Sequence, residues 1–197
     1  MTRALVKLHR GKGKHLFFSK KNQVLLRLES YLERDYALRL EFDDDVISYC
    51  CQPETCHTDR GQRTPDFLVK RSNERFEYIE VHLASRVDDE YRARMKYFND
   101  YIYAKSRRTF LLVTDEDMNK VASKNLDFLY EYKSLGFSYE LSNLPEELSL
   151  AMLIHYFEES SMSRNNAHAA ALSTIADAIY AFDMKEILSH STLLKRN

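Results

Sequence analysis

Alternation of apolar and polar residues is clearest near the middle of the 197-residue chain. Residues 76–85, FEYIEVHLAS, alternate and are rich in side chains that favour strands. Residues 64–71, TPDFLVKR, form a second short run, which has a proline near its start. The polar segment SNER separates the two runs. Because so short a connection suits a tight turn, the pattern predicts two strands paired as an antiparallel hairpin.

A helical period precedes this hairpin. Apolar residues recur at steps of three and four through residues 22–41, which predicts one amphipathic helix over that range. The apolar stripe consists of Leu25, Leu28, Leu32, Tyr36 and Leu40. The run DDD then ends the helix, and VISYCCQ at 46–52 predicts a short strand. Residues 52–63 are polar, with a proline and a glycine, and predict a loop or hairpin.

Two helices and an apolar strand follow the hairpin. Residues 88–106 predict an amphipathic helix with acidic residues in its first turn, and residues 116–133 predict another helix. Between them, RTFLLVTD at 108–115 is mostly apolar, as expected for a strand covered on both faces. A right-handed crossover would set this strand parallel to the one at 76–85. The order of elements therefore predicts an α/β fold with a mixed sheet flanked by helices.

The character of the chain changes near its C-terminal third. Residues 144–160 and 165–182 are helical in pattern and are separated by a polar turn. We therefore divide the chain into a basic N-terminal arm at 1–21, an α/β domain at 22–136 and a small, mainly helical domain at 137–197. The last of these is short enough to be a winged-helix-like module with a reduced wing.

Composition is that of a soluble globular protein. Hydrophobic residues make up 44% of the chain and charged residues 30%, with a net charge of -1. No apolar run approaches the roughly 20 residues that span a bilayer, and no signal peptide is evident. We expect a cytoplasmic protein without a membrane partner. Three clustered cysteines lack a second pair of ligands nearby, which favours reduced thiols over a zinc site.

Charge is unevenly distributed along the chain. The first 28 residues contain no acidic residue, and a basic arm can neutralise phosphates along DNA. A solvated tail is the alternative explanation for this segment. If the chain binds DNA, the candidate contacts are Arg10, Lys12, Lys14, Lys20 and Lys21 near the N-terminus and Lys70 on a predicted strand.

Acidic side chains meet on the predicted hairpin. Side chains alternate faces along a strand, so Glu80 and His82 point the same way, and Asp66 on the neighbouring strand can join them. Two converging carboxylates form an oxygen-rich site that suits Mg²⁺ or Mn²⁺. Such ions stabilise charge on a phosphodiester and can activate the attacking water. Glu33 on the preceding helix is the candidate third carboxylate, with Glu29 one turn away as the alternative.

The order of these features resembles a known nuclease superfamily and, within it, one family. An acidic helix, a strand opened by Pro-Asp, a strand carrying Glu, a helix and an apolar strand form the core of restriction-endonuclease-like nucleases. Across roughly residues 28–132, the chain is similar to the TnsA-type endonuclease subunits of heteromeric cut-and-paste transposons. The motifs that carry the resemblance are LEF, SY followed by QPE, TPDFLV, IEV and TDEDMNKV.

The resemblance implies a metal-dependent DNA endonuclease that cuts one strand at each transposon end. By position, Glu33, Asp66 and Glu80 match the acidic site residues of the family and would bind Mg²⁺. The resemblance also implies two protein partners. One is a separate transposase that cuts and joins the other strand, and the second is an AAA+ ATPase that contacts the C-terminal part of the chain.

The chain departs from the family at His82, where the resemblance leads us to expect a lysine. A histidine can carry positive charge beside carboxylates, accept a proton as a general base, or ligate a softer metal. A basic residue from elsewhere, among them Lys70, Arg86, Arg92 and Lys96, is another source of charge. Two further interpretations stay open: a TnsA-like subunit with weak or lost activity that bridges DNA and partner proteins, and a repair or junction nuclease of the same fold.

Overall fold

A four-stranded sheet forms the centre of the computed structural model, which describes residues 15–138, 144–160 and 162–197. Its order is β3-β6-β7-β8. The strands are Val46–Cys51 (β3), Phe67–Arg71 (β6), Phe76–His82 (β7) and Thr109–Thr114 (β8). β6 pairs antiparallel with β3 and with β7, and β8 pairs parallel with β7. The predicted hairpin, the parallel pair and the mixed sheet are therefore confirmed.

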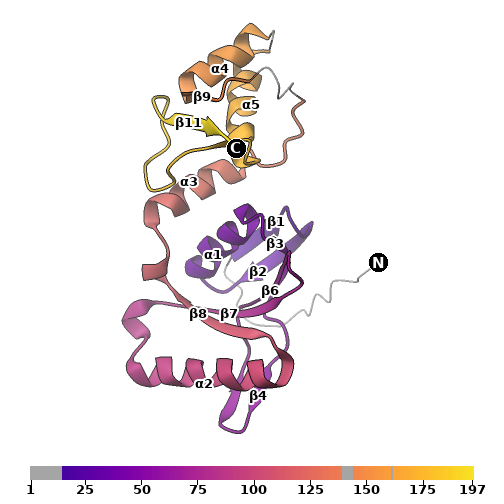
Figure 1. Cartoon of the computed structure of the whole chain (residues 1–197), viewed down its shortest axis with the longest axis vertical. Coiled ribbons are helices and arrows are strands. Elements are labelled where there is room, and N and C mark those ends of the chain that lie inside the picture. Colours follow the sequence, from indigo (N-terminus) through magenta and orange to yellow (C-terminus); the bar gives the residue numbers. More distant parts are fainter. Residues whose placement is uncertain (1–14, 139–143, 161) are drawn as a thin grey trace.

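Helices cover both faces of this sheet, as Figure 1 shows. α1 (Tyr31–Phe42) lies on one face and α2 (Asp89–Ser106) on the other. Ser30 and Asp88 cap the two helices, because their side chains accept hydrogen bonds from backbone N–H groups of the first turns. The caps fix where each helix begins, and so they fix where its first turn stands relative to the strand ends.

Alternation along β7 divides the buried residues between two cores. Val81 packs with Leu38 in a core beneath α1, called here the α1-side core. Tyr78 packs with Phe98 in a second core beneath α2, the α2-side core. Because side chains alternate along a strand, Glu80 lies on the same side as Tyr78. The polar end of β7 therefore faces α2.

The segment 22–41 is not one helix, and that prediction is wrong. Val24–Leu28 is strand β2, which pairs antiparallel with β1 (His15–Ser19), and the helix begins only with α1. Leu26 is buried whereas Leu25 is exposed, which is the alternation of a strand with one covered face. The leucine spacing fits either structure, and pairing with β1 decides between them because strand formation depends strongly on tertiary context.

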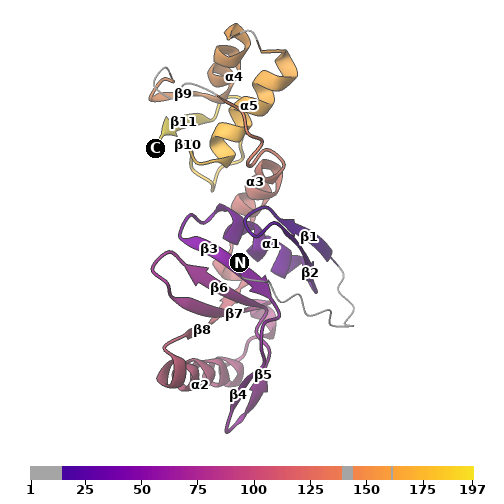
Figure 2. The same cartoon turned by 90° about the vertical axis from the view of Figure 1, so that its right-hand side faces the viewer.

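The β4–β5 hairpin extends beyond the sheet beside α2, as Figure 2 shows. It consists of β4 (Cys56–Thr58) and β5 (Gly61–Arg63), and it confirms the hairpin that was one alternative for residues 52–63. Cys56 is buried in the α2-side core. Gly61 at the turn has a φ of 139°, a conformation that side chains disfavour and glycine adopts freely. The hairpin is thus held against α2 at its base.

The C-terminal part of the chain forms a third packed cluster, the C-terminal core, with a three-stranded sheet of order β10-β11-β9. Its elements are β9 (Glu147–Ser149), α4 (Leu150–Glu159), α5 (Arg164–Ala176), β10 (Tyr180–Ala181) and β11 (Leu193–Arg196). The two predicted helices are present but shorter, because residues at their outer ends enter β9 and β10. No helix within the described ranges has the length and apolar character needed to cross a membrane.

Helix α3 (Lys120–Tyr130) joins this part to the central sheet. A 3-10 turn, η2 (Asp115–Asp117), leads from β8 toward it, and a similar turn, η1 (Ala84–Arg86), precedes α2. Leu126 of α3 belongs to the α1-side core, whereas Leu129 belongs to the C-terminal core. One helix therefore packs into both.

Candidate active site

Asp66 and Glu80 lie side by side where β6 begins and β7 ends. The register of the two strands pairs Phe67 with Ile79, so Asp66, one residue before β6, lies opposite Glu80. The backbone N–H of Val81 donates a hydrogen bond of 2.7 Å to Asp66 Oδ2, which fixes the aspartate side chain. The hairpin thus brings together the two carboxylates that the sequence singled out.

Burial and neighbouring negative charge raise the pKa of Asp66 to about 8. Burial is the larger cause, and the carboxylate of Glu80 follows it. Glu33 adds to the increase, whereas the bond from Val81 and the charge of Arg63 oppose it. An aspartate in such surroundings retains its proton near neutral pH unless additional positive charge arrives. The site therefore favours a cation.

Glu80 is almost completely buried and only half satisfied. It is 4% exposed, and its Oε1 accepts hydrogen bonds from Arg63 Nη2 and, at 3.3 Å, from Tyr91 Oη. In the part of the chain that the structure describes, Oε2 has no hydrogen-bond partner. A buried carboxylate oxygen without a partner is costly, so it is a natural ligand for a proton or a metal ion.

Glu33 acts on this pair from α1, on the opposite side of the sheet. Its carboxylate accepts hydrogen bonds of 2.8 Å from the backbone N–H of Glu29 and from Ser30 Oγ, in the manner of a capping box. Burial raises the pKa of Glu33, and the charges of Glu29 and Glu80 raise it further. Glu33 is buried and Glu29 is exposed, so Glu33 is the better candidate of the two, although its oxygens already serve the start of α1.

His82 lies beyond Glu80 on the same face of β7 and stacks on Tyr91 of α2. The two rings are nearly parallel, at 6°, with their centroids 4.8 Å apart. Arg63 and Arg94 also approach the Tyr91 ring, at 5.2 Å and 5.0 Å from its centroid. The stack sets the orientation of the imidazole, which is shorter than the lysine side chain that the resemblance leads us to expect.

Arg63, the last residue of β5, is the site residue that the sequence did not reveal. Its Nη2 donates to Glu80 Oε1 and, at 2.6 Å, to Tyr91 Oη. The hydrogen bond to Glu80 is the main cause that raises the pKa of Arg63 above its ordinary value, so the guanidinium stays charged. The one signal in the sequence was its position three residues before Asp66.

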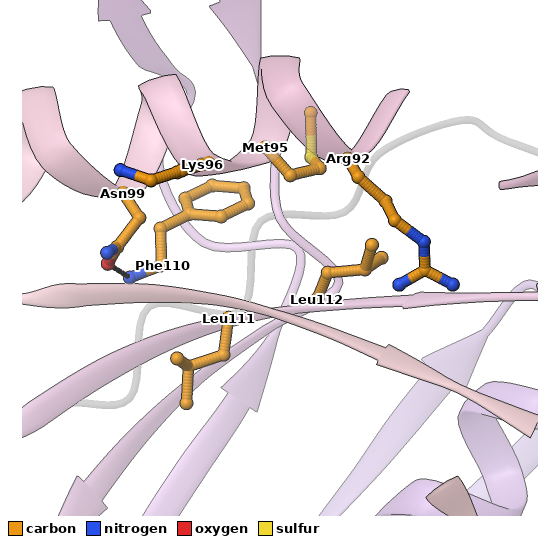
Figure 3. Close-up of a pocket in the computed structure, with 7 residues that line it drawn as sticks. All are labelled: Arg92, Met95, Lys96, Asn99, Phe110, Leu111 and Leu112. Atoms are coloured by element: carbon orange, nitrogen blue, oxygen red, sulfur yellow. Dashed lines mark hydrogen bonds between the residues drawn. The ribbon is translucent and has the colours of Figure 1, made fainter. Parts of the chain in front are cut away.

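The basic residues proposed from the sequence as substitutes for a lysine have other surroundings. Lys70 and Lys96 each pair with an acidic residue four positions later in the chain, and Arg86 is exposed in η1. Figure 3 shows Arg92 and Lys96 beside a hollow of about 250 Å³ between α2 and β8. The hollow is also lined by Met95, Asn99, Phe110, Leu111 and Leu112. Of the basic residues considered, Arg63 alone bonds to Glu80 in the described structure.

Two of the predicted DNA contacts take part in internal hydrogen bonds. Lys20 Nζ donates to the carbonyl of Tyr130 at 2.6 Å, and Lys21 Nζ donates to that of Val46 at 2.6 Å. These bonds tie the turn between β1 and β2 to α3 and β3, which gives both lysines a structural role. Arg10, Lys12 and Lys14 lie outside the described residues. Contact of any of these side chains with DNA stays a prediction.

The donors at the site fit a hard divalent cation. No group of three His, Cys, Asp or Glu side chains in the described ranges is arranged to hold a metal ion. Asp66 and Glu80 nevertheless offer neighbouring carboxylate oxygens, including the unpartnered Glu80 Oε2. Mg²⁺ is commonly held by one or two carboxylates, with waters and substrate phosphates completing its shell. The pair matches the share of ligands that a protein supplies in such sites.

Comparison with known proteins leaves the family open, since no protein-family model matches the chain and no curated protein matches it at a significant level. The resemblance to TnsA-type endonucleases therefore rests on the combination of motifs in the sequence alone.

Proposed function

We propose that this protein is a metal-dependent DNA endonuclease with a restriction-endonuclease-like domain. The observation that carries the proposal is the neighbouring pair Asp66 and Glu80 at the joined ends of β6 and β7. The raised pKa of Asp66 and the unpartnered Oε2 of Glu80 support it, because both describe an oxygen site where the charge of Arg63 leaves room for a further cation. Mg²⁺ and Mn²⁺ are the cations that suit oxygen donors of this kind.

Each residue has a role that its position allows. Asp66 and Glu80 would hold the cation, and Glu33 would assist through water or through its charge. The bound cation supplies stabilisation of the negative charge that develops on a phosphodiester under attack. His82 shares the face of Glu80, where an imidazole nitrogen can accept a proton from the attacking water. Stacking on Tyr91 would hold that ring in a fixed orientation.

The biological setting that we propose comes from the resemblance to TnsA-type subunits. In that setting, the protein works in the cytoplasm and cuts one strand at each transposon end. A separate transposase processes the other strand, and an AAA+ ATPase binds the C-terminal part of the chain. The C-terminal core, with helices α4 and α5 against a small sheet, provides a folded surface there for such a contact. That this part of the chain is a winged-helix-like module is also a proposal.

A nicking assay tests the proposed activity. Plasmid DNA carrying the transposon ends is incubated with the protein and its partners in Mg²⁺ or Mn²⁺, and nicked product is measured on gels. We expect cleavage by the wild type and at least about 100-fold less by Asp66→Ala. Asp100→Asn removes an exposed carboxylate of α2 as a matched control and should leave cleavage unchanged. Equal products from wild type and Asp66→Ala would show that the proposal is wrong.

The contact between Arg63 and Glu80 also supports an alternative, because the guanidinium occupies a carboxylate oxygen that could otherwise bind a cation. In this alternative the protein is a subunit with weak or lost activity that bridges DNA and partner proteins. This alternative predicts assembly with the partners and no cleavage in the same assay. A repair or junction nuclease, the third possibility, predicts cleavage of branched or damaged DNA without partners. Adding a branched substrate, with and without partners, separates the three.

A further inference from the structure

The β4–β5 hairpin is fixed against α2 at two places. At its base, Cys56 is buried with Tyr91 in the α2-side core. Near its tip, Asp59 accepts a hydrogen bond from the hydroxyl of Tyr97, and the guanidinium of Arg60 lies 4.2 Å from the centroid of the same ring. A hairpin held at both ends presents its final residue, Arg63, in a defined position.

Arg63 uses only part of its hydrogen-bonding capacity. Its Nη2 bonds to Glu80 Oε1 and Tyr91 Oη, while its Nε is buried and has no hydrogen-bond partner among the described residues. The side chain is 28% exposed, so part of it is accessible to a ligand. Glu80 is satisfied on Oε1 and unpartnered on Oε2. One carboxylate can therefore serve a guanidinium on one oxygen and a cation on the other.

We propose that Arg63 binds a phosphate oxygen of the DNA next to the Asp66–Glu80 pair and supplies the positive charge that the expected lysine would have carried on β7. This inference rests on the proposed nuclease function. An arginine suits the task because its planar guanidinium stays charged and binds phosphate oxygens in a fork geometry. Tyr91 orients the guanidinium, and Glu80 ties its position to that of the cation.

DNA binding tests the inference without requiring cleavage. Affinity for a short DNA duplex is measured by fluorescence anisotropy in Ca²⁺, which binds oxygen ligands, and again in EDTA. We expect Arg63→Ala to bind about tenfold more weakly in Ca²⁺. The difference should shrink in EDTA, because the unscreened carboxylates then repel phosphate near Arg63. Arg75→Ala removes an exposed arginine from the turn between β6 and β7, at the end of that hairpin away from Asp66 and Glu80, and as a matched control it should stay within about twofold of wild type.

One further variant keeps the test decisive if Arg63→Ala does not fold, and another extends the test if it does. Arg63→Lys retains a charge beside Glu80 but loses the fork, so we expect an intermediate affinity at an unchanged Tm. In cleavage assays, adding His82→Lys to Arg63→Ala should restore most of the lost activity, since it returns a cation to the strand. A purely structural role of Arg63 predicts no such rescue. Wild-type affinity of Arg63→Ala or, where that variant does not fold, of Arg63→Lys in Ca²⁺ overturns the inference.

The inference and the proposed function fail in different ways. If wild type does not cut DNA but Arg63→Ala loses its Ca²⁺-dependent binding, the nuclease proposal fails and phosphate binding by Arg63 stands. If wild type cuts in a manner that depends on Asp66, and Arg63→Ala binds and cuts equally well, the nuclease proposal stands and Arg63 has no part in it.

Discussion

Glu41 and Glu80 are both buried glutamates, but only the first has a complete set of partners. Glu41 on α1 is 1% exposed, and its Oε1 accepts hydrogen bonds from Ser19 Oγ and, at 2.6 Å, from Tyr49 Oη. Its Oε2 accepts a third bond of 2.9 Å from the backbone N–H of Lys21. Neutral donors on three different segments therefore surround this carboxylate, and they join α1 to β3 and to the β1–β2 turn.

Glu80 differs from Glu41 in the kind of partner and in what is missing. A charged guanidinium and one hydroxyl share its Oε1, and its Oε2 has no partner in the described structure. A second carboxylate, Asp66, lies beside it. The comparison teaches that burial alone does not mark a functional carboxylate. A fully bonded one stabilises the fold, whereas a half-bonded one next to another acid retains the capacity to bind a cation.

The largest expected effect separates the two glutamates by activity. Glu80→Gln keeps the shape of the side chain but removes the charge that would hold a cation. We expect DNA cleavage to fall by at least about 100-fold, and binding of Mn²⁺, measured by calorimetry, to weaken strongly. Glu41→Gln should retain most of both properties per folded molecule. Loss of cation binding in Glu41→Gln and not in Glu80→Gln would reverse the assignment.

The next largest effect distinguishes Glu41 from Glu80 by their contributions to stability. Glu41→Ala leaves the hydroxyl groups of Ser19 and Tyr49 buried without their acceptor. We expect the free energy of unfolding to fall by roughly 3 kcal/mol, measured by urea denaturation. The same measurement on Glu80→Gln should show a clearly smaller loss. Comparable losses in the two variants would show that the sites do not differ in their structural role.

A pH series sharpens the comparison at Asp66. The pKa of Asp66 is about 8 in the folded protein and about 3.9 in an unfolded chain, so between these values the folded state binds one more proton. The free energy of unfolding should therefore fall as pH rises from about 4 to about 8, by about 1.4 kcal/mol per pH unit from this group. Asp66→Asn removes this slope. Urea unfolding in EDTA should therefore show that the free energy of unfolding of the variant rises relative to that of wild type as pH increases.

Added Mg²⁺ provides the control for that series. At pH 8, saturating Mg²⁺ should raise the stability of wild type by about 2–3 kcal/mol at 100 times its Kd, and it should leave Asp66→Asn nearly unchanged. Parallel pH curves for the two proteins in EDTA would contradict the raised pKa. Equal stabilisation of both proteins by Mg²⁺ would place the cation elsewhere.

The smallest expected effect is the change in stability when an exposed carboxylate is removed. Asp100 on α2 pairs with Lys96 at the surface, where both side chains are more than half exposed. Solvent screens such a pair and side-chain entropy opposes it, so Asp100→Asn should change the free energy of unfolding by at most about 0.5 kcal/mol. Thermal unfolding checks this, and a larger loss would mean that surface pairs also stabilise this fold.

Local patterns in the sequence predicted the central hairpin correctly. Alternation over β7, the Pro-Asp start of β6 and the short turn between them were enough to predict a hairpin that places Asp66 beside Glu80. Such patterns failed over Val24–Leu28, because leucine spacing there fits a helix and a strand equally, and the partner β1 is what selects the strand. A local pattern cannot predict a structure that depends on pairing with another segment of the chain.

Arg63 illustrates the same limit at the site. Its contact with Glu80 joins positions 17 residues apart and depends on the course of a hairpin that was only one of two possibilities for residues 52–63. A single arginine in a polar loop carries no periodicity and matches no motif. The contact of His82 with Tyr91 could not be predicted from the sequence either, because the stacking depends on where α2 begins.

Helix α3 has a mechanical consequence for the whole chain. Leu126 and Leu129 stand one turn apart and anchor the helix in the α1-side core and the C-terminal core. Lys20 adds a clamp from the β1–β2 turn to the end of the helix. A displacement of the C-terminal core would act on α3 and, through the ion pair of Asp127 with Arg34, on α1, the helix that bears Glu33. A partner that binds the C-terminal core would therefore bear on the first turn of α1, where Arg34 follows Glu33.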